Sequence, residues 1–300
     1  MSAKKKYPVI LRKINTFLAV KGVFNFLSDE KFLKMRYKLC VGRSLDLNEP
    51  KTFNEKIQWL KIHKRLPKYI SMVDKISVKD YVSEIIGEEY VIPTLGVWDK
   101  AEDVDFDSLP NQFVLKCNHD SGGIVICKNK SDLDKQSALK KLKKALKRNP
   151  YNAAREWPYK SVQRRILAEE YLEDDKLREL RDYKFFTFNG EVKALFVASD
   201  RQDPNKETKF DFFDSNYNRL PIVNGHPNSE KLPEKPENFE LMKELAKKLG
   251  QGMPHVRVDF YEVNGRVYFG ELTFYHYGGL VAFEPNHWDE VFGSWIDLTI

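Results

Sequence analysis

The sequence predicts an α+β fold, with antiparallel hairpins and helices occupying different stretches of the chain. Two hairpins are indicated by the dipeptides Asn189-Gly190 and Asn264-Gly265, each lying between runs of apolar and aromatic residues. Helices are indicated before and between these hairpins by apolar residues that recur every three or four positions. With 300 residues, of which 42% are hydrophobic, the chain is long enough to bury a substantial core in two lobes.

The N-terminal end is predicted to be helical and carries most of the basic charge. Residues 9–27 and 30–39 have helical apolar spacing with basic residues in between. Residues 1–43 contain eleven Lys or Arg and two Asp or Glu, a net charge of +9, whereas the rest of the chain carries −3. Such a segment either lies on an anionic membrane surface or packs on the domain with its charged face in solvent. A nucleic-acid binder would carry this charge on the folded body, so no nucleic-acid partner is expected.

The next elements are recognised by their capping and stop signals. Thr52 and Glu55 have the spacing of a capping box, which predicts the start of a helix. A second helix is expected to end at Gly87. Strands are predicted at 90–97, 113–117, 124–127 and 165–172, and helices at 128–148, capped by Ser131, and near 237–249. Residues 200–235 form a polar stretch without a predicted element.

A lysine and a glycine-containing loop adjoin the predicted strand at 113–117. Strand alternation places Lys116 opposite the apolar side chains of this strand, where a buried ammonium would need an anionic partner. In the loop that follows, Gly122 and Gly123 allow backbone N–H groups to approach phosphate oxygens, and Ser121 adds a hydroxyl. These residues are typical either of a nucleotide site or of an ordinary hairpin whose lysine reaches solvent.

The final hairpin holds the strongest chemical signal. Alternation places Arg257 and Asp259 together on one face of their strand, and Glu271 and Thr273 together on one face of theirs. The two pairs share a face only if the connecting loop has an odd length, so we expect a three-residue loop with a left-handed Gly265. Two carboxylates beside an arginine suit Mg²⁺ that bridges phosphate oxygens. The alternative is a surface ion-pair cluster.

The composition favours a cytoplasmic protein. No run approaches the roughly 18 apolar residues that span a bilayer, and the apolar stretch near the N-terminus is interrupted by Arg12, Lys13 and Lys21. The cysteines form no CxxC pair, which argues against a disulfide framework or a zinc site: Cys40, Cys117 and Cys127. We expect a location in the cytoplasm, with membrane association at its inner face if the N-terminal helix binds lipid.

Five segments, taken in order, resemble the ATP-grasp superfamily. They are Asp74-Lys75 with Lys79, FVLKCNHDSGG, ILAEEYL, RDYKFFTFNGEVKALFV and RVDFYEVNGRVYFGELTF. The resemblance covers residues 45–290 and is closest to the TupA-like branch, named after teichuronopeptide biosynthesis and found in bacterial surface-polysaccharide loci. It implies an ATP-grasp fold, with ATP and Mg²⁺ held between two α+β lobes. The implied parts are a helical extension or reduced N-terminal lobe at 1–70, a lid lobe at 71–170 and a catalytic lobe at 171–300.

The resemblance also implies roles for individual residues. The residues that resemble nucleotide-binding positions fall into five groups. They are the phosphate lysines Lys79 and Lys116, the phosphate loop Ser121, Gly122 and Gly123, the adenine-side acid Glu169, the purine hinge Glu170, Tyr171 and Leu172, and the ribose acid Asp182. Those that resemble metal ligands are Asp259, Glu271 and Thr273, the last standing where many members have Asn. Those that resemble catalytic cations are Lys184 and Arg201, near the γ-phosphate and substrate, and Arg257, which steadies the acyl-phosphate.

These roles imply an ATP- and Mg²⁺-dependent carboxylate–amine ligase. The carboxylate is expected to belong to a small molecule or a glycan, such as a precursor of a bacterial capsule or cell-surface polysaccharide. Two alternatives remain open. Asp103-Val104-Asp105 has the Asp-x-Asp pattern of glycosyltransferases, and a kinase could use the same ATP-grasp scaffold.

Overall fold

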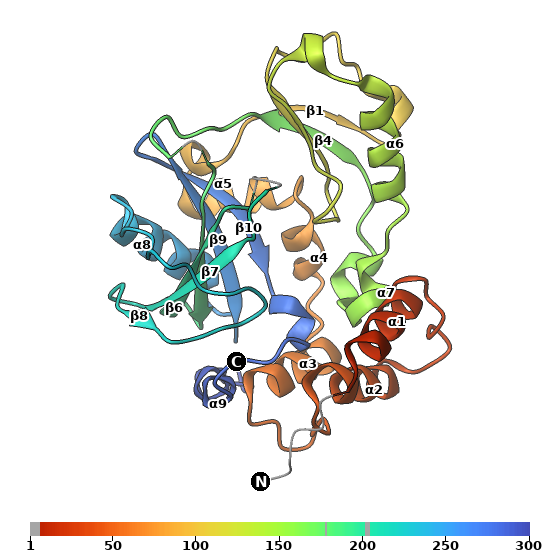
Figure 1. The fold of residues 1–300 in the computed structure, drawn as a ribbon, viewed down its shortest axis with the longest axis vertical. Coiled ribbons are helices and arrows are strands. Elements are labelled where there is room, and N and C mark those ends of the chain that lie inside the picture. Colours follow the sequence, from red (N-terminus) through yellow and green to blue (C-terminus); the bar gives the residue numbers. More distant parts are fainter. Residues whose placement is uncertain (1–6, 178, 202–204) are drawn as a thin grey trace.

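The computed structural model describes residues 7–177, 179–201 and 205–300, and has the α+β architecture that the sequence predicts. Figure 1 shows two sheets with helices packed around them. The helices are α1 (Val9–Val20), α2 (Asp29–Val41), α3 (Phe53–His63), α4 (Lys68–Val73), α5 (Val78–Ile86), α6 (Lys135–Leu146), α7 (Pro150–Ala154), α8 (Phe239–Gly250) and α9 (His287–Ser294). The strands are β1 (Thr94–Trp98), β2 (Phe113–Cys117), β3 (Val125–Cys127), β4 (Ile166–Glu170), β5 (Asp182–Phe188), β6 (Glu191–Ser199), β7 (Lys209–Asp214), β8 (Arg219–Leu220), β9 (Val256–Val263) and β10 (Arg266–Thr273).

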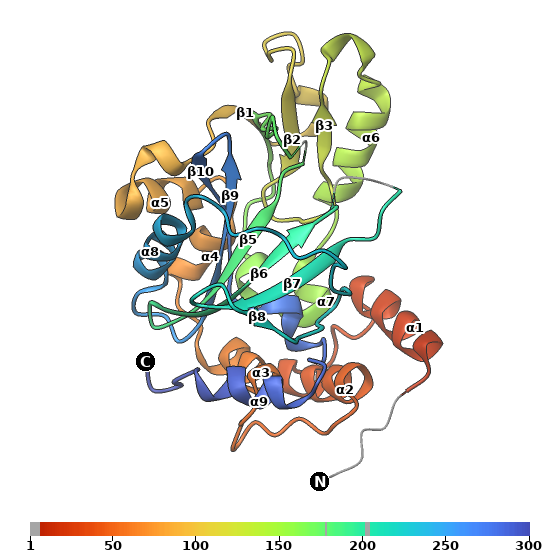
Figure 2. The ribbon, with the colours of Figure 1, turned by 60° about the vertical axis from the view of Figure 1, so that its left-hand side comes forward.

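The strands form two separate antiparallel sheets. The smaller sheet has the order β1-β4-β2-β3, and α6 packs against it at one end of the molecule (Figures 1 and 2). The larger sheet has the order β10-β9-β5-β6-β7-β8, and α8 packs on its strands β5, β6 and β9. Helices α1 to α3 gather with α9 at the opposite end from α6. Each sheet has its own apolar core, that of the larger sheet including α3, and α1 and α2 form most of a third cluster.

Several predicted elements are confirmed by their local chemistry. Helix α3 begins with the predicted capping box, because the Thr52 hydroxyl accepts from the N–H of Glu55 and the Glu55 carboxylate accepts from the N–H of Thr52. Helix α5 ends at Gly87, whose φ of 118° disfavours other residues. The predicted strand at 113–117 is β2, and the helix near 237–249 is α8.

Other predicted boundaries are wrong for identifiable reasons. The helix predicted at 9–27 ends at Val20, because Gly22 adopts a left-handed φ of 76°. The helix predicted from residue 128 begins at Lys135, and its N-cap is Asp134 rather than Ser131. Ser131 lies instead in a short 3₁₀ turn. The strands predicted at 90–97 and 165–172 are the shorter β1 and β4. The polar stretch at 200–235 contains β7 and β8, whose few apolar residues are too short a run to stand out.

The hairpin tips are both two-residue turns with left-handed φ values at Asn and Gly. These values are 48° and 78° at Asn189-Gly190 and 50° and 76° at Asn264-Gly265, as in a type I′ turn. The expectation of a three-residue loop at the second tip is therefore wrong. A β-bulge at Gly270 supplies the odd residue instead, since Phe269 pairs with Phe260 whereas Glu271 pairs with Asp259.

A buried histidine gives the core a pH dependence. His255 lies among the rings of Phe53, Phe186 and Phe188, and its Nδ1 donates to the carbonyl of Thr187 at 3.0 Å. Burial lowers the pKa of His255 to about 3. The depressed pKa means that its contribution to stability is complete above pH 6.5 and is lost as the pH falls towards 3. We expect this residue alone to reduce the free energy of unfolding by about 2 kcal/mol between pH 6.5 and pH 5.

Urea unfolding at these two pH values measures the effect. The variant His255→Leu should show a flatter dependence on pH, whereas His287→Leu, which changes an exposed histidine, should keep the wild-type slope. Equal slopes for wild type and His255→Leu would contradict the assignment.

Candidate active site

Three adjacent strands bring the polar residues of the C-terminal half onto one face of the larger sheet. The register pairs Lys184 on β5 with Asp259 on β9, and Asp259 with Glu271 on β10. Arg257 and Thr273 form the next pair of these two strands on the same face. The bulge at Gly270 is what makes this possible, because Phe269 before it points into the core while Glu271 after it faces the carboxylate of Asp259.

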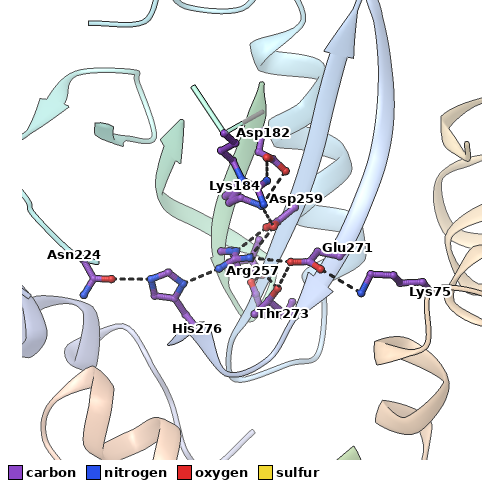
Figure 3. A network of polar contacts seen from close by, with 12 residues as sticks. Lys75, Asp182, Lys184, Asn224, Arg257, Asp259, Glu271, Thr273 and His276 are labelled. Atoms are coloured by element: carbon purple, nitrogen blue, oxygen red, sulfur yellow. Dashed lines mark hydrogen bonds and ion pairs between the residues drawn. The ribbon is translucent and has the colours of Figure 1, made fainter. Parts of the chain in front are cut away.

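Arg257 is the centre of this face (Figure 3). Its guanidinium donates to both carboxylate oxygens of Asp259, through Nε and Nη2, at 2.7 Å each. Nη2 also donates to Glu271 Oε1 at 3.2 Å and to Thr273 Oγ1 at 3.0 Å. Burial opposes the charge of Arg257, but Asp259 and Glu271 outweigh this effect and raise its pKa. The planar fork of the guanidinium thus fixes the positions of both carboxylates.

A second cation approaches Asp259 from β5. The Lys184 ammonium forms ion pairs with Asp259 and, at 3.0 Å, with Asp182. Asp182 also pairs with Arg201, which follows the end of β6. Lys184, Asp182 and Asp259 are buried, while Arg201 is partly exposed. Cations and carboxylates therefore alternate along this face, and each buried charge has a partner.

His276 and Asn224 form a chain of hydrogen bonds that holds the Arg257 guanidinium in place. Arg257 Nη1 donates to Nδ1 of His276 at 2.7 Å, and Nε2 of His276 donates to the side-chain oxygen of Asn224 at 2.9 Å. Asn224 is itself held by the carbonyls of Val281 and Ala282. Burial and the nearby Arg257 charge lower the pKa of His276 well below its ordinary value. The neutral ring can therefore accept from the arginine and donate to the amide at once.

The loop that carries His276 is held in place by hydrogen bonds from helix α3. Gln58 donates to the carbonyls of Gly278 and Gly279 at 2.9 and 2.8 Å, and the fully buried Lys61 donates to Gly278 at 2.6 Å. Both glycines have a φ of 61°, which side chains rarely adopt. Burial lowers the pKa of Lys61 to about 7. Helix α3 thus contributes to the position of Arg257 through this loop.

The smaller sheet contributes a carboxylate flanked by two lysines. Glu169 on β4 is buried and forms ion pairs with Lys116 on β2 and, at 2.8 Å, with Lys79 on α5. Lys79 also donates to the carbonyl of Ile92 and to Thr94 Oγ1, both at 2.7 Å. Burial raises the pKa of Glu169, but the two lysines outweigh burial and lower it. Glu169 is therefore ionised and holds both ammonium groups in place.

The two sheets meet at a small cavity. Its lining combines three lysines and one carboxylate with apolar side chains: Lys75, Val78, Lys79, Val91, Ile92, Lys116, Glu169, Phe269 and Gly270. Lys75 Nζ also lies 3.8 Å from Glu271 Oε2, which links the lysine group to the face around Arg257 (Figure 3). The cavity has a volume of about 10 Å³, far below the roughly 300 Å³ at which ligand pockets begin. A bound nucleotide would therefore require the sheets to move apart.

The phosphate loop of the sequence prediction lies against α6. A Cβ on Gly122 would be 2.6 Å from Arg148 Nη1, and one on Gly123 would be 2.2 Å from the Cβ of Ala145. Within the described part of the chain, no polar contact joins Ser121, Gly122 or Gly123 to the cations and carboxylates above. Close packing on α6 is a sufficient reason for Gly123, whereas the neighbour of Gly122 is the flexible end of the Arg148 side chain.

The predicted purine hinge follows the end of β4. The N–H of Glu170 donates to the carbonyl of Pro93 at 3.2 Å, and the ring of Tyr171 lies 5.5 Å from the ammonium of Lys128. Leu172 is partly buried just beyond the strand. The structure brings none of these three side chains into the network around Arg257, so their proposed contact with a base stays a prediction.

Sequence reasoning left four contributors without a role. Lys75 was noted only as part of a motif, although its spacing of four residues from Lys79 could have placed both on one side of the turn. His276 lies among aromatic residues in the sequence, and nothing near it indicates its contact with Arg257. Asn224 and Gln58 carry no local signal, because only the folded chain brings them to the loop at 275–280.

The oxygen atoms on the face around Arg257 suit a magnesium ion. In residues 7–177, 179–201 and 205–300, no group of three His, Cys, Asp or Glu could hold a metal. Mg²⁺ usually takes only one or two carboxylates and completes its octahedron with phosphate oxygens and water. Asp259 and Glu271 supply two such carboxylates, and Lys75, Lys184, Arg201 and Arg257 hold the pKa of the partly buried Glu271 well below its usual range.

The lysine pair provides a test of the predicted nucleotide site. We expect Lys116→Met to raise the Kd for Mg²⁺-ATP by at least about 30-fold, because the predicted ion pair with a phosphate would be lost and Glu169 would keep a single cation. Isothermal calorimetry measures the change. The control is Lys143→Met, which removes a lysine that pairs with Glu102 at the surface. Unchanged binding in Lys116→Met would exclude this lysine from the nucleotide site.

Comparison with known proteins completes the description of the site. A sequence profile described as TupA-like ATPgrasp matches residues 55–297. A D-alanine–D-alanine ligase from Helicobacter pylori has a TM-score of 0.45 and 14% identity over 82% of this chain. An L-amino acid ligase from Bacillus licheniformis has a TM-score of 0.44 and 14% identity, also over 82%. This chain spans 64% and 55% of those two proteins. No protein of curated function matches. At such identities, a likeness does not carry over substrates or site residues.

Proposed function

Because this chain belongs to the TupA-like ATP-grasp family, we propose that it is an ATP- and Mg²⁺-dependent ligase that joins a carboxylate to an amine. The observation that carries the proposal is the convergence of charges between the two sheets. Lysines from the smaller sheet and α5 line a cavity with residues of β10, and Asp259, Glu271 and Arg257 lie together on β9 and β10. Such an arrangement of cations and oxygen ligands suits a triphosphate with its metal.

In the proposed reaction, the residues of the chain divide between binding and charge stabilisation. Lys79 and Lys116 bind the α- and β-phosphates, and Lys184 and Arg201 lie near the γ-phosphate and the carboxylate substrate. Asp259 and Glu271 would hold Mg²⁺, assisted by Thr273, and the ion would supply positive charge beside the transferring phosphoryl group.

The proposed role of Arg257 is to stabilise the negative charge that develops on the acyl group. The carboxylate oxygen attacks the γ-phosphorus, and ADP leaves to give an acyl-phosphate. The amine attacks the acyl carbon, loses a proton and expels phosphate, so that the products are an amide, ADP and phosphate. The guanidinium of Arg257 stabilises the oxyanion that forms in this second step. Its fixed contacts with Asp259 and His276 supply the preorganisation that this role needs.

The substrate class and the division of the chain are part of the same proposal. The carboxylate belongs to a uronic acid or another acidic residue of a bacterial capsule or cell-surface polysaccharide precursor, and the reaction takes place in the cytoplasm. Residues 71–170 contain the smaller sheet and serve as a lid lobe, while residues 171–300 contain the larger sheet and serve as the catalytic lobe. Residues 1–70 replace the usual N-terminal lobe by helices.

A single assay tests the reaction type. The protein is incubated with ATP, Mg²⁺, uronic acids or their nucleotide sugars, and a pool of amino acids. Release of phosphate that requires both the acid and the amine supports a ligase. ATP consumption with the acid alone, giving a stable phosphorylated product, would instead identify a kinase. UDP release without ATP would identify a glycosyltransferase.

In the structure, Asp105 of the Asp-x-Asp pattern accepts from the N–H groups of Asp107 and Ser108, the ordinary use of Asp in a turn.

A further inference from the structure

Helix α1 presents an apolar face to solvent. Large apolar side chains recur along it and through the turn that follows, and among them Ile10, Phe17 and Phe26 are 62%, 61% and 80% exposed. Val9, Ile14 and Val20 are exposed between these positions. Residues 9 to 26 thus hold half of the large apolar side chains that are exposed in the described part of the chain. A soluble monomer rarely leaves so continuous an apolar surface uncovered.

Polar contacts fix this helix with its apolar face outward. The buried Arg36 donates to the side chains of Asn15 and Thr16 at 2.5 and 3.1 Å, on the side of α1 that faces α2. Arg155 donates to the carbonyl of Phe24 and to the side chain of Asn25, at 2.9 and 3.1 Å. The helix is therefore attached through the side that carries Asn15, Thr16 and the buried Ala19. The helix thus packs on the domain with its basic residues in solvent, which is one of the two alternatives expected from the sequence, and its large apolar side chains are exposed as well.

Exposed basic residues lie on the same stretch as the apolar face. They are Arg12, Lys13 and Lys21, and the ammonium of Lys21 lies 5.8 Å from the centre of the Phe17 ring. Towards the other end of the molecule, helix α6 also carries the exposed lysines Lys140 and Lys144. Both views place α6 and α1 along the same side of the molecule (Figures 1 and 2). Apolar groups flanked by lysine and arginine are typical of a helix that lies in the interface of an anionic bilayer.

We propose that α1 and the turn up to Phe26 dock on an anionic lipid surface. The apolar face enters the boundary between headgroups and acyl chains, while the basic residues contact the lipid phosphates. No helix in the described residues is long and apolar enough to cross a bilayer, so the contact is peripheral. The charge around the face argues for anionic lipid over a second copy of the chain, because two copies meeting through α1 would bring their basic residues together. The proposal does not depend on the ligase reaction, since vesicle binding requires no turnover.

Vesicle co-sedimentation of the full chain tests this proposal. We expect binding to phosphatidylcholine vesicles with about 30% phosphatidylglycerol and at least about tenfold weaker binding to pure phosphatidylcholine. The double variant Ile10→Glu/Phe17→Glu should lose at least about tenfold in binding to the anionic vesicles. The matched control is Leu241→Glu, which adds a charge to an apolar side chain that is 39% exposed on α8, and it should bind as wild type does. Lys140→Glu/Lys144→Glu should weaken binding to the anionic vesicles alone.

Three outcomes would overturn the proposal. One is a wild-type chain that stays in the supernatant with anionic vesicles. Another is equal binding by wild type and Ile10→Glu/Phe17→Glu. The last is a dimer in light scattering that dissociates in this double variant without any vesicle binding, which would identify a second copy of the chain as the occupant. ATP turnover in solution should be the same in wild type and in the double variant, which separates loss of docking from loss of the fold.

Discussion

Asp259→Asn is expected to lower ATP turnover by at least about 10³-fold, which corresponds to about 4 kcal/mol. The amide keeps the shape of the carboxylate but removes the negative charge that would hold Mg²⁺. It also leaves Arg257 and Lys184 with one fewer anionic partner. The free energy of unfolding should fall by about 3 kcal/mol. The chain should still fold, because Asp182 continues to pair with Lys184 and Glu271 with Arg257.

A matched variant distinguishes the loss of chemistry from the loss of stability. Asp211→Asn changes another fully buried carboxylate of the same sheet, on β7, where it accepts from the N–H and hydroxyl of Ser229. This variant should also be destabilised, by about 1–3 kcal/mol, yet turn over ATP at close to the wild-type rate. Thermal unfolding and a coupled ADP assay provide both measurements. Turnover by Asp259→Asn within tenfold of wild type would show that Asp259 is not a metal ligand.

Arg257→Lys is expected to reduce kcat by about 10²- to 10³-fold with a much smaller effect on the KM for ATP. Lysine keeps the positive charge, but it cannot donate at once to Asp259, Glu271, Thr273 and His276, as the guanidinium does. The loss should therefore fall on the step in which negative charge develops on the acyl group. Steady-state kinetics with saturating carboxylate and amine give the two constants separately.

The control for this variant lies on the same hairpin. Arg266→Lys makes the same exchange at an exposed position on β10, and both kinetic constants should stay within about twofold of wild type. A rise in KM alone for Arg257→Lys would place the guanidinium in ground-state binding and would remove it from the oxyanion role.

Local chemistry explains which parts of the fold could be predicted from the sequence. The capping box at Thr52 and Glu55, the stop at Gly87 and the Asn-Gly turns each depend on neighbours within a few residues. For the same reason, the placement of Asp259 and Glu271 near Arg257 could be anticipated. The backbone geometry that produces this placement could not be predicted. A two-residue turn with a bulge and a three-residue loop without one both bring Glu271 opposite Asp259.

Contacts between distant segments were beyond such reasoning. Lys75 reaches Glu271 across the two sheets, and His276 meets Asn224 from 52 residues away. Lys61 and Gln58 look like ordinary members of an amphipathic helix, although they hold the loop behind Arg257. Equally, nothing in residues 9–26 distinguishes a buried apolar face from an exposed one, because that depends on whether Arg36 and Arg155 bind the opposite side.

The extra residue at Gly270 has a consequence for how this hairpin can change during evolution. It changes which face the odd-numbered residues of β10 lie on. Before the bulge Val267 and Phe269 point into the core, and after it Glu271 and Thr273 lie on the charged face. A related chain could reach the same pairing with a hairpin one residue shorter and no bulge. If two such chains were aligned by counting residues from the hairpin tip, Glu271 would be matched with a core residue of the other chain. The correct match is found by taking the residue that pairs with the equivalent of Asp259 on the neighbouring strand.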